Sequence, residues 1–218
     1  LQLGFLKVLP GTLMAQKAAA YGLIYMQEPP YEVLATKYLS AAELMELKIL
    51  SEVFDLTYNS GLFSQTLQFL TQQETAGAFA FYQKLAAWWR EQNLFGSGHS
   101  AGHTTELLYR FTQTAYPQLE AEARELLRYD VMVMQKGWQP DWLQWQSTKN
   151  YARSTAFWRD EARVQQYVPA YKFKNWRLLK QQYALEEFNF NPLSFTREKC
   201  WILVDYTHLK TQKINLFS

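Results

Sequence analysis

The chain has 218 residues, of which 48% are hydrophobic and 17% are aromatic, and a formal net charge of +2. This length suits one domain with a sizeable core, or one domain with part of another, and the hydrophobic content excludes a disordered chain. The near balance of charge does not favour a nucleic-acid partner, and the longest apolar runs fall short of the ~20 residues of a membrane span, so we expect no membrane contact.

The first twenty residues predict a buried strand followed by a helix. Leu3, Phe5 and Val8 favour the strand, which stops at Pro10-Gly11, and Thr12 can cap a helix over 15–20. A strand that feeds a helix through a tight turn is one unit of an α/β barrel or sheet. Because a single strand cannot form a sheet, we expect the chain to be a piece of a larger protein.

The sequence Pro29-Pro30-Tyr31-Glu32 predicts a stiff, extended segment. Each proline fixes its own φ angle and disfavours helix in the residue before it. Two interpretations remain open. We favour a rigid linker over 29–39, and the alternative is a substrate-side loop in which Tyr31 or Glu32 points inward.

Helices are expected between residues 40 and 134. Ser40 and Glu43 form a capping box for a helix over 41–58, and Gly61 is suited to its C-terminal end. Apolar residues at helical spacing predict further helices over 64–72, 78–92, 105–114 and 119–134. Helix pairs joined by short polar loops indicate a helical bundle or a layered helical domain.

A loop rich in glycine and serine, FGSGHSAGH, carries the one pattern that resembles a metal site. On a helix, His99, His103 and Glu106 would share one face, and two histidines with a carboxylate can hold zinc. Gly98 and Gly102 argue against a helix there, and the spacing lacks the glutamate of a metalloprotease signature. We therefore predict a mobile loop followed by a helix start, and no metal site.

Aromatic rings alternate with cations in the middle of the chain, where the pattern supports only short helices. The residues concerned are Trp138, Trp142, Trp145, Lys149, Arg153, Trp158, Arg159 and Arg163. Such a stretch can stack bases and pair with the phosphates of RNA. The balanced charge favours instead an aromatic cluster beside a helix, with cations extending into solvent. An RNA-binding module therefore remains an alternative function, as does a protein-interaction module, which a large exposed apolar patch would favour.

The last third of the chain predicts a small antiparallel sheet, with strands over 185–190, 201–206 and 214–217. The expected fold is thus mainly α-helical with a small C-terminal β-sheet, preceded by a strand–turn–helix.

Cys200, the single cysteine, lies beside the second of these strands. It excludes an internal disulfide and fits a reducing cytoplasm, which is where we expect the protein. It also excludes an iron–sulfur cluster held by this chain alone, because such clusters need about four thiolates.

Three segments resemble a known family. LQLGFLKVLPGT at 1–12 is similar to the last core strand and following loop of the cobalamin-binding radical S-adenosylmethionine (SAM) proteins. YGLIYMQEPPYEVLATKYLS at 21–40 and YNSGLF at 58–63 resemble the C-terminal domain of unknown function in one branch of them. The similarity is dense over roughly the first seventy residues and looser beyond.

The resemblance implies a domain organisation and a function. Residues 1–28 would be a remnant of the radical SAM core, 29–39 a linker, and 40–218 a helical accessory domain on the substrate side. The parent would use SAM, an iron–sulfur cluster and cobalamin, with Leu9, Pro10, Gly11 and Thr12 on the SAM side. We expect the chain itself to be non-catalytic, to hold no cofactor, and to have the rest of the parent polypeptide as its partner.

Overall fold

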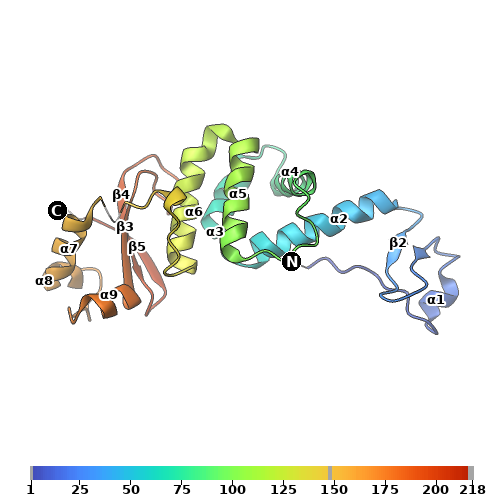
Figure 1. The fold of residues 1–218 in the computed structure, drawn as a ribbon, viewed down its shortest axis with the longest axis horizontal. Helices are drawn as coiled ribbons and strands as arrows, with labels where there is room; N and C mark the ends of the chain where they lie inside the picture. Colours follow the sequence, from blue (N-terminus) through green and yellow to red (C-terminus); the bar gives the residue numbers. More distant parts are fainter. Residues whose placement is uncertain (1, 147–148, 216–218) are drawn as a thin grey trace. The chain divides into compact units, whose positions relative to one another are not determined.

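The computed structural model describes residues 2–146 and 149–215 (Figure 1). The chain divides into two compact units. The N-terminal unit comprises Leu1–Ser60 and Glu74–Ser100, and the C-terminal unit comprises Gly61–Gln73 and Ala101–Ser218. The predicted fold class, mainly helical with a small antiparallel sheet near the C-terminus, is confirmed. The boundaries expected at residues 28 and 39 remain predictions.

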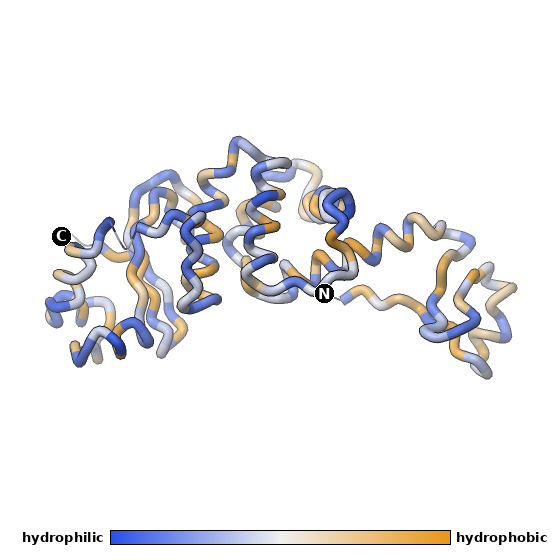
Figure 2. Tube along the Cα trace, in the orientation of Figure 1, coloured by the Kyte–Doolittle hydropathy of each residue, from blue (hydrophilic) through white to orange (hydrophobic). Residues whose placement is uncertain are grey.

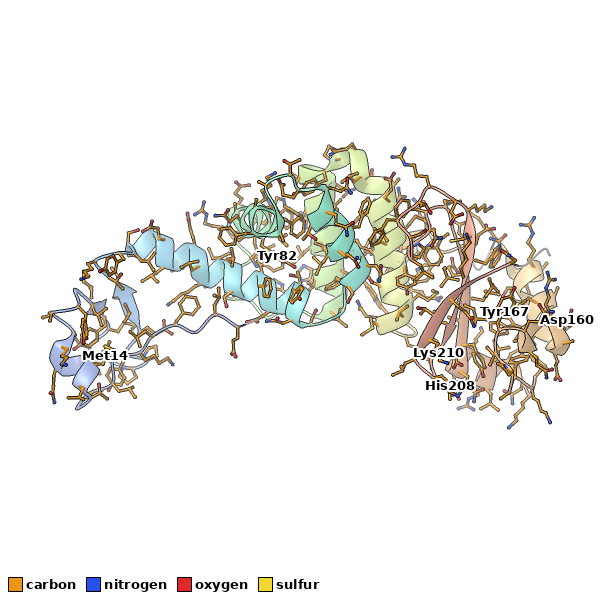
Figure 3. The ribbon with its side chains drawn as sticks, turned by 180° about the vertical axis from the view of Figure 1, so that it is seen from behind. Met14, Tyr82, Asp160, Tyr167, His208 and Lys210 are labelled. Atoms are coloured by element: carbon orange, nitrogen blue, oxygen red, sulfur yellow. The ribbon has the colours of Figure 1, made fainter. Side chains whose placement is uncertain are left out.

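The N-terminal unit begins with an extended segment, a short helix and a hairpin. Helix α1 (Leu13–Lys17) is capped as predicted, because the Thr12 hydroxyl accepts a hydrogen bond from the Ala15 N–H at 3.2 Å. Strands β1 (Ile24–Tyr25) and β2 (Val33–Ala35) pair antiparallel. Together these elements enclose a small apolar cluster, whose members include Val8, Ala18 and Val33, with Met14 of α1 packed against it (Figure 3).

The expectation of a buried N-terminal strand is wrong for most of the segment. Val8 is buried, but Phe5 is only partly buried and Leu3 is exposed. The one regular bridge joins Lys7 to Glu32. The physical reason is that a buried strand needs paired neighbours on both sides, and within the described part of the chain this segment pairs with the short hairpin alone.

Two helices make up the rest of the core of the N-terminal unit. Helix α2 (Ala41–Phe54) starts with the predicted capping box and continues as a π-helical turn, η1 (Asp55–Asn59). Helix α4 (Ala78–Glu91) packs against α2. Their contact includes Tyr82 of α4, which is labelled in Figure 3. Its ring centroid lies 4.8 Å from that of Phe54.

The helices of the C-terminal unit are α3 (Ser64–Gln73), α5 (Ala101–Ala115) and α6 (Glu120–Met134), with the 3₁₀ turn η2 (Pro117–Leu119) before α6. Helix α5 starts four residues earlier than the sequence predicts, so Gly102 lies inside it. A Cβ atom at that position would come within 3.0 Å of the Trp138 ring. The glycine therefore lets the Trp138 ring approach α5 closely, and it does not end the helix.

The remainder of the C-terminal unit is a sheet with short helices. After the 3₁₀ turn η3 (Asp141–Leu143) come α7 (Tyr151–Arg159), α8 (Glu161–Gln165) and α9 (Trp176–Gln182). Strands β3 (Tyr183–Phe188), β4 (Cys200–Asp205) and β5 (Lys210–Ile214) form an antiparallel sheet in the order β3-β4-β5.

The third strand lies earlier than the predicted range 214–217, of which 216–217 fall outside the described residues. The reason is that β5 is a polar edge strand, KTQKI, without the alternation of apolar residues that marks a half-buried strand.

The two faces of the sheet are covered by different helices, as Figure 1 shows. Leu185, Trp201 and Leu203 face α7, α8 and α9, whereas Phe188 and Ile202 face α6. Strand β4 is buried along its whole length, and Figure 2 shows hydrophobic residues along the sheet. Burial on both faces explains why β4 appears in the sequence as a continuous apolar run.

Candidate functional site

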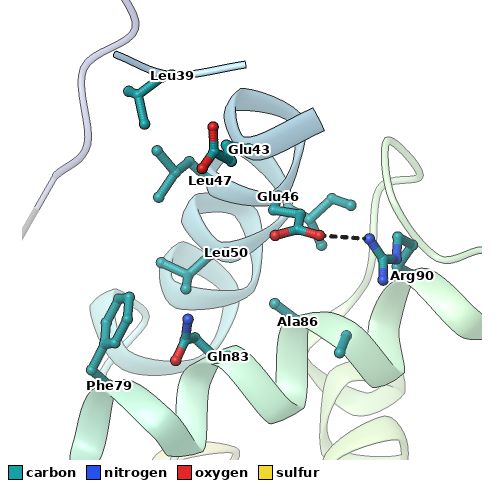
Figure 4. Close-up of a pocket in the computed structure, with 11 residues that line it drawn as sticks. Leu39, Glu43, Glu46, Leu47, Leu50, Phe79, Gln83, Ala86 and Arg90 are labelled. Atoms are coloured by element: carbon teal, nitrogen blue, oxygen red, sulfur yellow. Dashed lines mark hydrogen bonds and ion pairs between the residues drawn. The ribbon is translucent and has the colours of Figure 1, made fainter. Parts of the chain in front are cut away.

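The N-terminal unit has a groove of about 360 Å³ between α2 and α4 (Figure 4). Its floor is apolar, with Leu47 and Leu50 on α2 opposite Ala86 on α4. The alanine leaves room that a larger side chain would fill. A concave, mostly apolar surface of this size is typical of a site for a small molecule or for part of one.

Polar groups line the rim of this groove. Glu46 of α2 and Arg90 of α4 form an ion pair at 3.0 Å, with side chains 62% and 55% exposed, so the pair contributes little to stability. Glu43 accepts hydrogen bonds from the backbone and hydroxyl of Ser40, which lower the pKa of its carboxyl. A carboxylate held ionised in this way serves helix capping better than proton transfer. The groove is therefore suited to binding.

The predicted SAM-side residues form the turn before α1. Gly11 has a φ of +79°, which the turn requires. The Thr12 hydroxyl donates to the Leu9 carbonyl at 2.7 Å and also caps α1. This hydroxyl is therefore engaged within the turn. What remains open to a ligand is the Leu9 side chain, which is 49% exposed.

The predicted substrate-side residues lie in the connection between β1 and β2. Tyr31 adopts a φ of +58°, and its N–H donates to the Glu28 carbonyl at 3.0 Å. Glu32 forms an ion pair with Lys48 of α2. Their hydrogen bond, more than any other influence, holds the pKa of the Glu32 carboxyl below its ordinary value, with a smaller contribution from Lys7. Glu32 thus ties the hairpin to α2.

The structure brings these two predicted segments together. The Val8 N–H donates to the Tyr31 carbonyl at 2.8 Å, and the Val33 N–H donates to the Leu6 carbonyl at 3.0 Å. The turn at Leu9–Thr12 therefore follows directly after a segment that pairs with the residues around Tyr31. The sequence alone gave no sign of this pairing, because the hairpin strands have only two and three residues.

The histidines lie in different surroundings. The ring of His99 packs edge-on against Trp89, with centroids 5.1 Å apart, and His103 lies in α5. Within 2–146 and 149–215, no group of three or more histidine, cysteine, aspartate or glutamate side chains is placed to hold a metal ion.

Cys200 is buried in β4, as part of the cluster between the sheet and α6. Burial raises the pKa of its thiol to about 11, so the thiolate that a metal or a cluster requires is disfavoured. Since an iron–sulfur cluster needs about four thiolates, this chain does not fit one.

The rings of the aromatic and basic stretch take part in packing, as the favoured interpretation of the sequence predicts. Trp158 is buried against Tyr171, with ring centroids 5.8 Å apart. Trp142 stacks on Tyr109 at 5.0 Å. The Trp145 indole N–H donates to the Pro140 carbonyl at 3.1 Å. These rings are therefore not a continuous platform for stacked bases.

Two of the buried charges of α6, Arg128 and Asp130, were not identified from the sequence. Asp130 accepts hydrogen bonds from the N–H groups of Gln65 and Thr66 and from the Thr66 hydroxyl, at 3.1, 2.9 and 2.7 Å. Arg128, fully buried, donates to the Glu125 carboxylate at 2.6 Å and to the Glu187 carbonyl at 2.8 Å. Neither residue lines a described cavity, so their role is to join elements of the C-terminal unit.

Among the residues with described structure, no helix is both long enough and apolar enough to cross a bilayer.

Comparison with known proteins places the chain in a family. No curated protein matches the chain, and neither does any solved structure. Residues 19–204 match the family described as "Protein of unknown function (DUF4080)". This confirms the expected domain of unknown function, and since the match spans most of the chain, the protein belongs to the DUF4080 family.

Proposed function

We propose that this chain is the substrate-side accessory domain of a cobalamin-binding radical SAM enzyme, and that it is itself non-catalytic. The support is the similarity of 1–12, 21–40 and 58–63 to that family. In such a parent, SAM is cleaved reductively at an iron–sulfur cluster, and cobalamin serves methyl transfer or related radical chemistry. The single thiol here does not fit a cluster, so the cofactors would belong to the barrel. A cytoplasmic location is part of the proposal and is supported by the lone cysteine.

The observation that carries the proposal is the backbone pairing of the N-terminal segment with the hairpin. In a barrel, ligands bind at the C-terminal ends of strands. The segment ending at Leu9 would have its C-terminal end at that face. Its hydrogen bonds to Tyr31 and Val33 then bring the hairpin to the same place. The resemblance and this pairing both support the proposal that the hairpin is the part of the accessory domain that approaches the substrate.

Each part of the N-terminal unit has a proposed task. The exposed Leu9 side chain and the backbone of the following turn would contact SAM. Tyr31 would contact the substrate. Helix α2 holds the hairpin through the Lys48–Glu32 ion pair and also forms one wall of the groove. The groove would take an apolar portion of the substrate, since its floor is apolar and its rim is polar.

The test uses the full-length parent, purified anaerobically with its cofactors. We expect the parent to cleave SAM under reducing conditions, and a parent without cluster or cleavage would overturn the proposal. Leu9→Asp should weaken SAM binding about tenfold, because it puts a charge against the ligand. Leu13→Asp is the matched control, since Leu13 is 72% exposed and is the first residue of α1, four positions after Leu9. Equal losses in both variants would contradict a specific role for Leu9.

A further inference from the structure

Positive charge is concentrated in one part of the C-terminal unit. Residues 149–182 contain eight lysines and arginines and two acidic residues, although the whole chain has a formal net charge of only +2. The rest of the protein is therefore net acidic. The small net charge of the whole chain therefore does not reveal that this segment generates a local positive potential.

The cations of this segment lie on its surface because its apolar residues face inward. Trp158, Tyr171 and Leu179 pack on the sheet, whereas the exposed cations are Lys149, Arg153, Arg159, Lys172, Lys174, Arg177 and Lys180. Within the described part of the chain, the structure shows no ion pair for the last four of these. Their charge is therefore available to a partner.

The two acidic residues of the segment are engaged with backbone groups. The Asp160 carboxylate accepts from the Arg163 N–H at 3.1 Å, and the Glu161 carboxylate accepts from the Phe173 N–H at 2.9 Å. Both carboxylates thus have local tasks in ordering the helix start and the loop before α9.

Positively charged side chains and aromatic rings lie close together in the loop that leads into α9. Lys172 and Lys174 line a cavity of about 230 Å³ together with Asn175. The partly buried rings of Phe173 and Trp176 contact each other edge to face, with centroids 5.0 Å apart. The guanidinium of Arg159 lies over the Trp176 ring at 5.8 Å. The site thus combines charges for phosphates with two aromatic rings that are only partly buried.

We propose that this basic face, formed by Arg159, Lys172, Lys174, Arg177 and Lys180, binds the phosphate backbone of a single-stranded nucleic acid. Proteins that bind single strands combine a positive surface with aromatic rings on which bases stack. An acidic protein surface would use the charges but has less need of the rings. The proposal does not rest on the radical SAM assignment, because it uses only residues of the C-terminal unit.

The test is a fluorescence-anisotropy titration of the 218-residue chain with a labelled 15-nucleotide single-stranded RNA, from 50 to 200 mM NaCl. With about four phosphates neutralised, log K should fall with log salt at a slope of about −3. The double variant Lys172→Gln/Lys174→Gln should bind about tenfold more weakly, and its slope should be shallower by about 1.4. A second pair, Arg177→Gln/Lys180→Gln, should act in the same direction.

The matched control is Lys17→Gln/Lys37→Gln, which makes the same change in charge at two exposed lysines of the N-terminal unit. It should leave the affinity within about twofold. No binding at 50 mM NaCl, or equal losses in the control and test pairs, would overturn the proposal. A glutamate-rich peptide that competes as well as RNA would also overturn it, since it would show an acidic protein partner. Tighter binding of RNA than of single-stranded DNA would support the proposal and add a contribution from the 2′-hydroxyls.

Discussion

Asp130 makes the stability of the C-terminal unit depend on pH. Its carboxylate lies on α6 and accepts three hydrogen bonds from the first turn of α3, so one helix caps another that is distant in sequence. Burial raises the pKa of this carboxyl from 3.8 to about 7, even though the three hydrogen bonds oppose the rise. Asp130→Asn removes the ionisation but leaves the side chain nearly the same size.

Proton linkage determines whether the free energy of unfolding rises or falls with pH. Between the two pKa values, the folded state keeps a proton that the unfolded state has released, so the free energy of unfolding decreases as the pH rises from about 4 to about 7. Above this window the Asp130 contribution is constant. From pH 5 to pH 7.5, this single group should lower the free energy of unfolding by roughly 2–3 kcal/mol.

The assay is urea unfolding of the wild-type chain and of Asp130→Asn at pH 5 and pH 7.5. Other titrating groups contribute equally to both proteins, so the difference between them isolates Asp130. At pH 5 the folded wild type carries a protonated carboxyl, both of whose oxygens can still accept a hydrogen bond, whereas the amide of the variant points an NH₂ group at one of the donors, so the variant should be less stable. At pH 7.5 the wild type should have lost this advantage or reversed it. Parallel pH dependences in the two proteins would refute the reasoning.

Further substitutions test other parts of the structure. Ser40→Ala removes the capping hydroxyl of α2 and should lower the free energy of unfolding in urea by about 1 kcal/mol. Arg128→Ala removes the cation that pairs with Glu125 and with the buried Glu186 and should cost about 3–5 kcal/mol in the same assay. Val8→Asp should open residues 1–35 to proteolysis, whereas Phe5→Asp should do so less, since only Val8 is fully buried. Cys200 should react slowly with a thiol reagent at pH 8 and rapidly in urea, because burial raises the pKa of its thiol to about 11.

Sequence patterns predicted the elements that depend on local interactions. The capping box at Ser40 and Glu43 involves residues three apart, and it forms as expected. The helices with apolar residues at regular spacing also lie where the pattern placed them, within a few residues at each end. The hairpin was missed because its strands are too short to show alternation. The role of Gly102 was predicted wrongly, because the need for a glycine there comes from a contact with Trp138, which is distant in the sequence.

The candidate site was predictable only in its parts. The sequence singled out Leu9–Thr12 and Tyr31–Glu32 separately, but the pairing that brings them together rests on backbone hydrogen bonds, which carry no side-chain signature. The groove between α2 and α4 arises where the small Ala86 faces the leucines of α2. An alanine in a helix is too common to indicate a cavity, so no pattern in the chain could have located this one.

Helix α6 shows why the helical periodicity of a sequence does not reveal buried charges. Every residue from 126 to 132 is buried, so this part of the helix has no exposed polar side to contrast with an apolar one. The two charges in this stretch make different connections: Asp130 meets the start of α3, and Arg128 meets the end of β3 and the carbonyl of Gln144. A wholly apolar α6 could pack in several rotations about its axis. Because each charge finds its partners in only one of them, we infer that this pair fixes the orientation of α6 between the helices and the sheet.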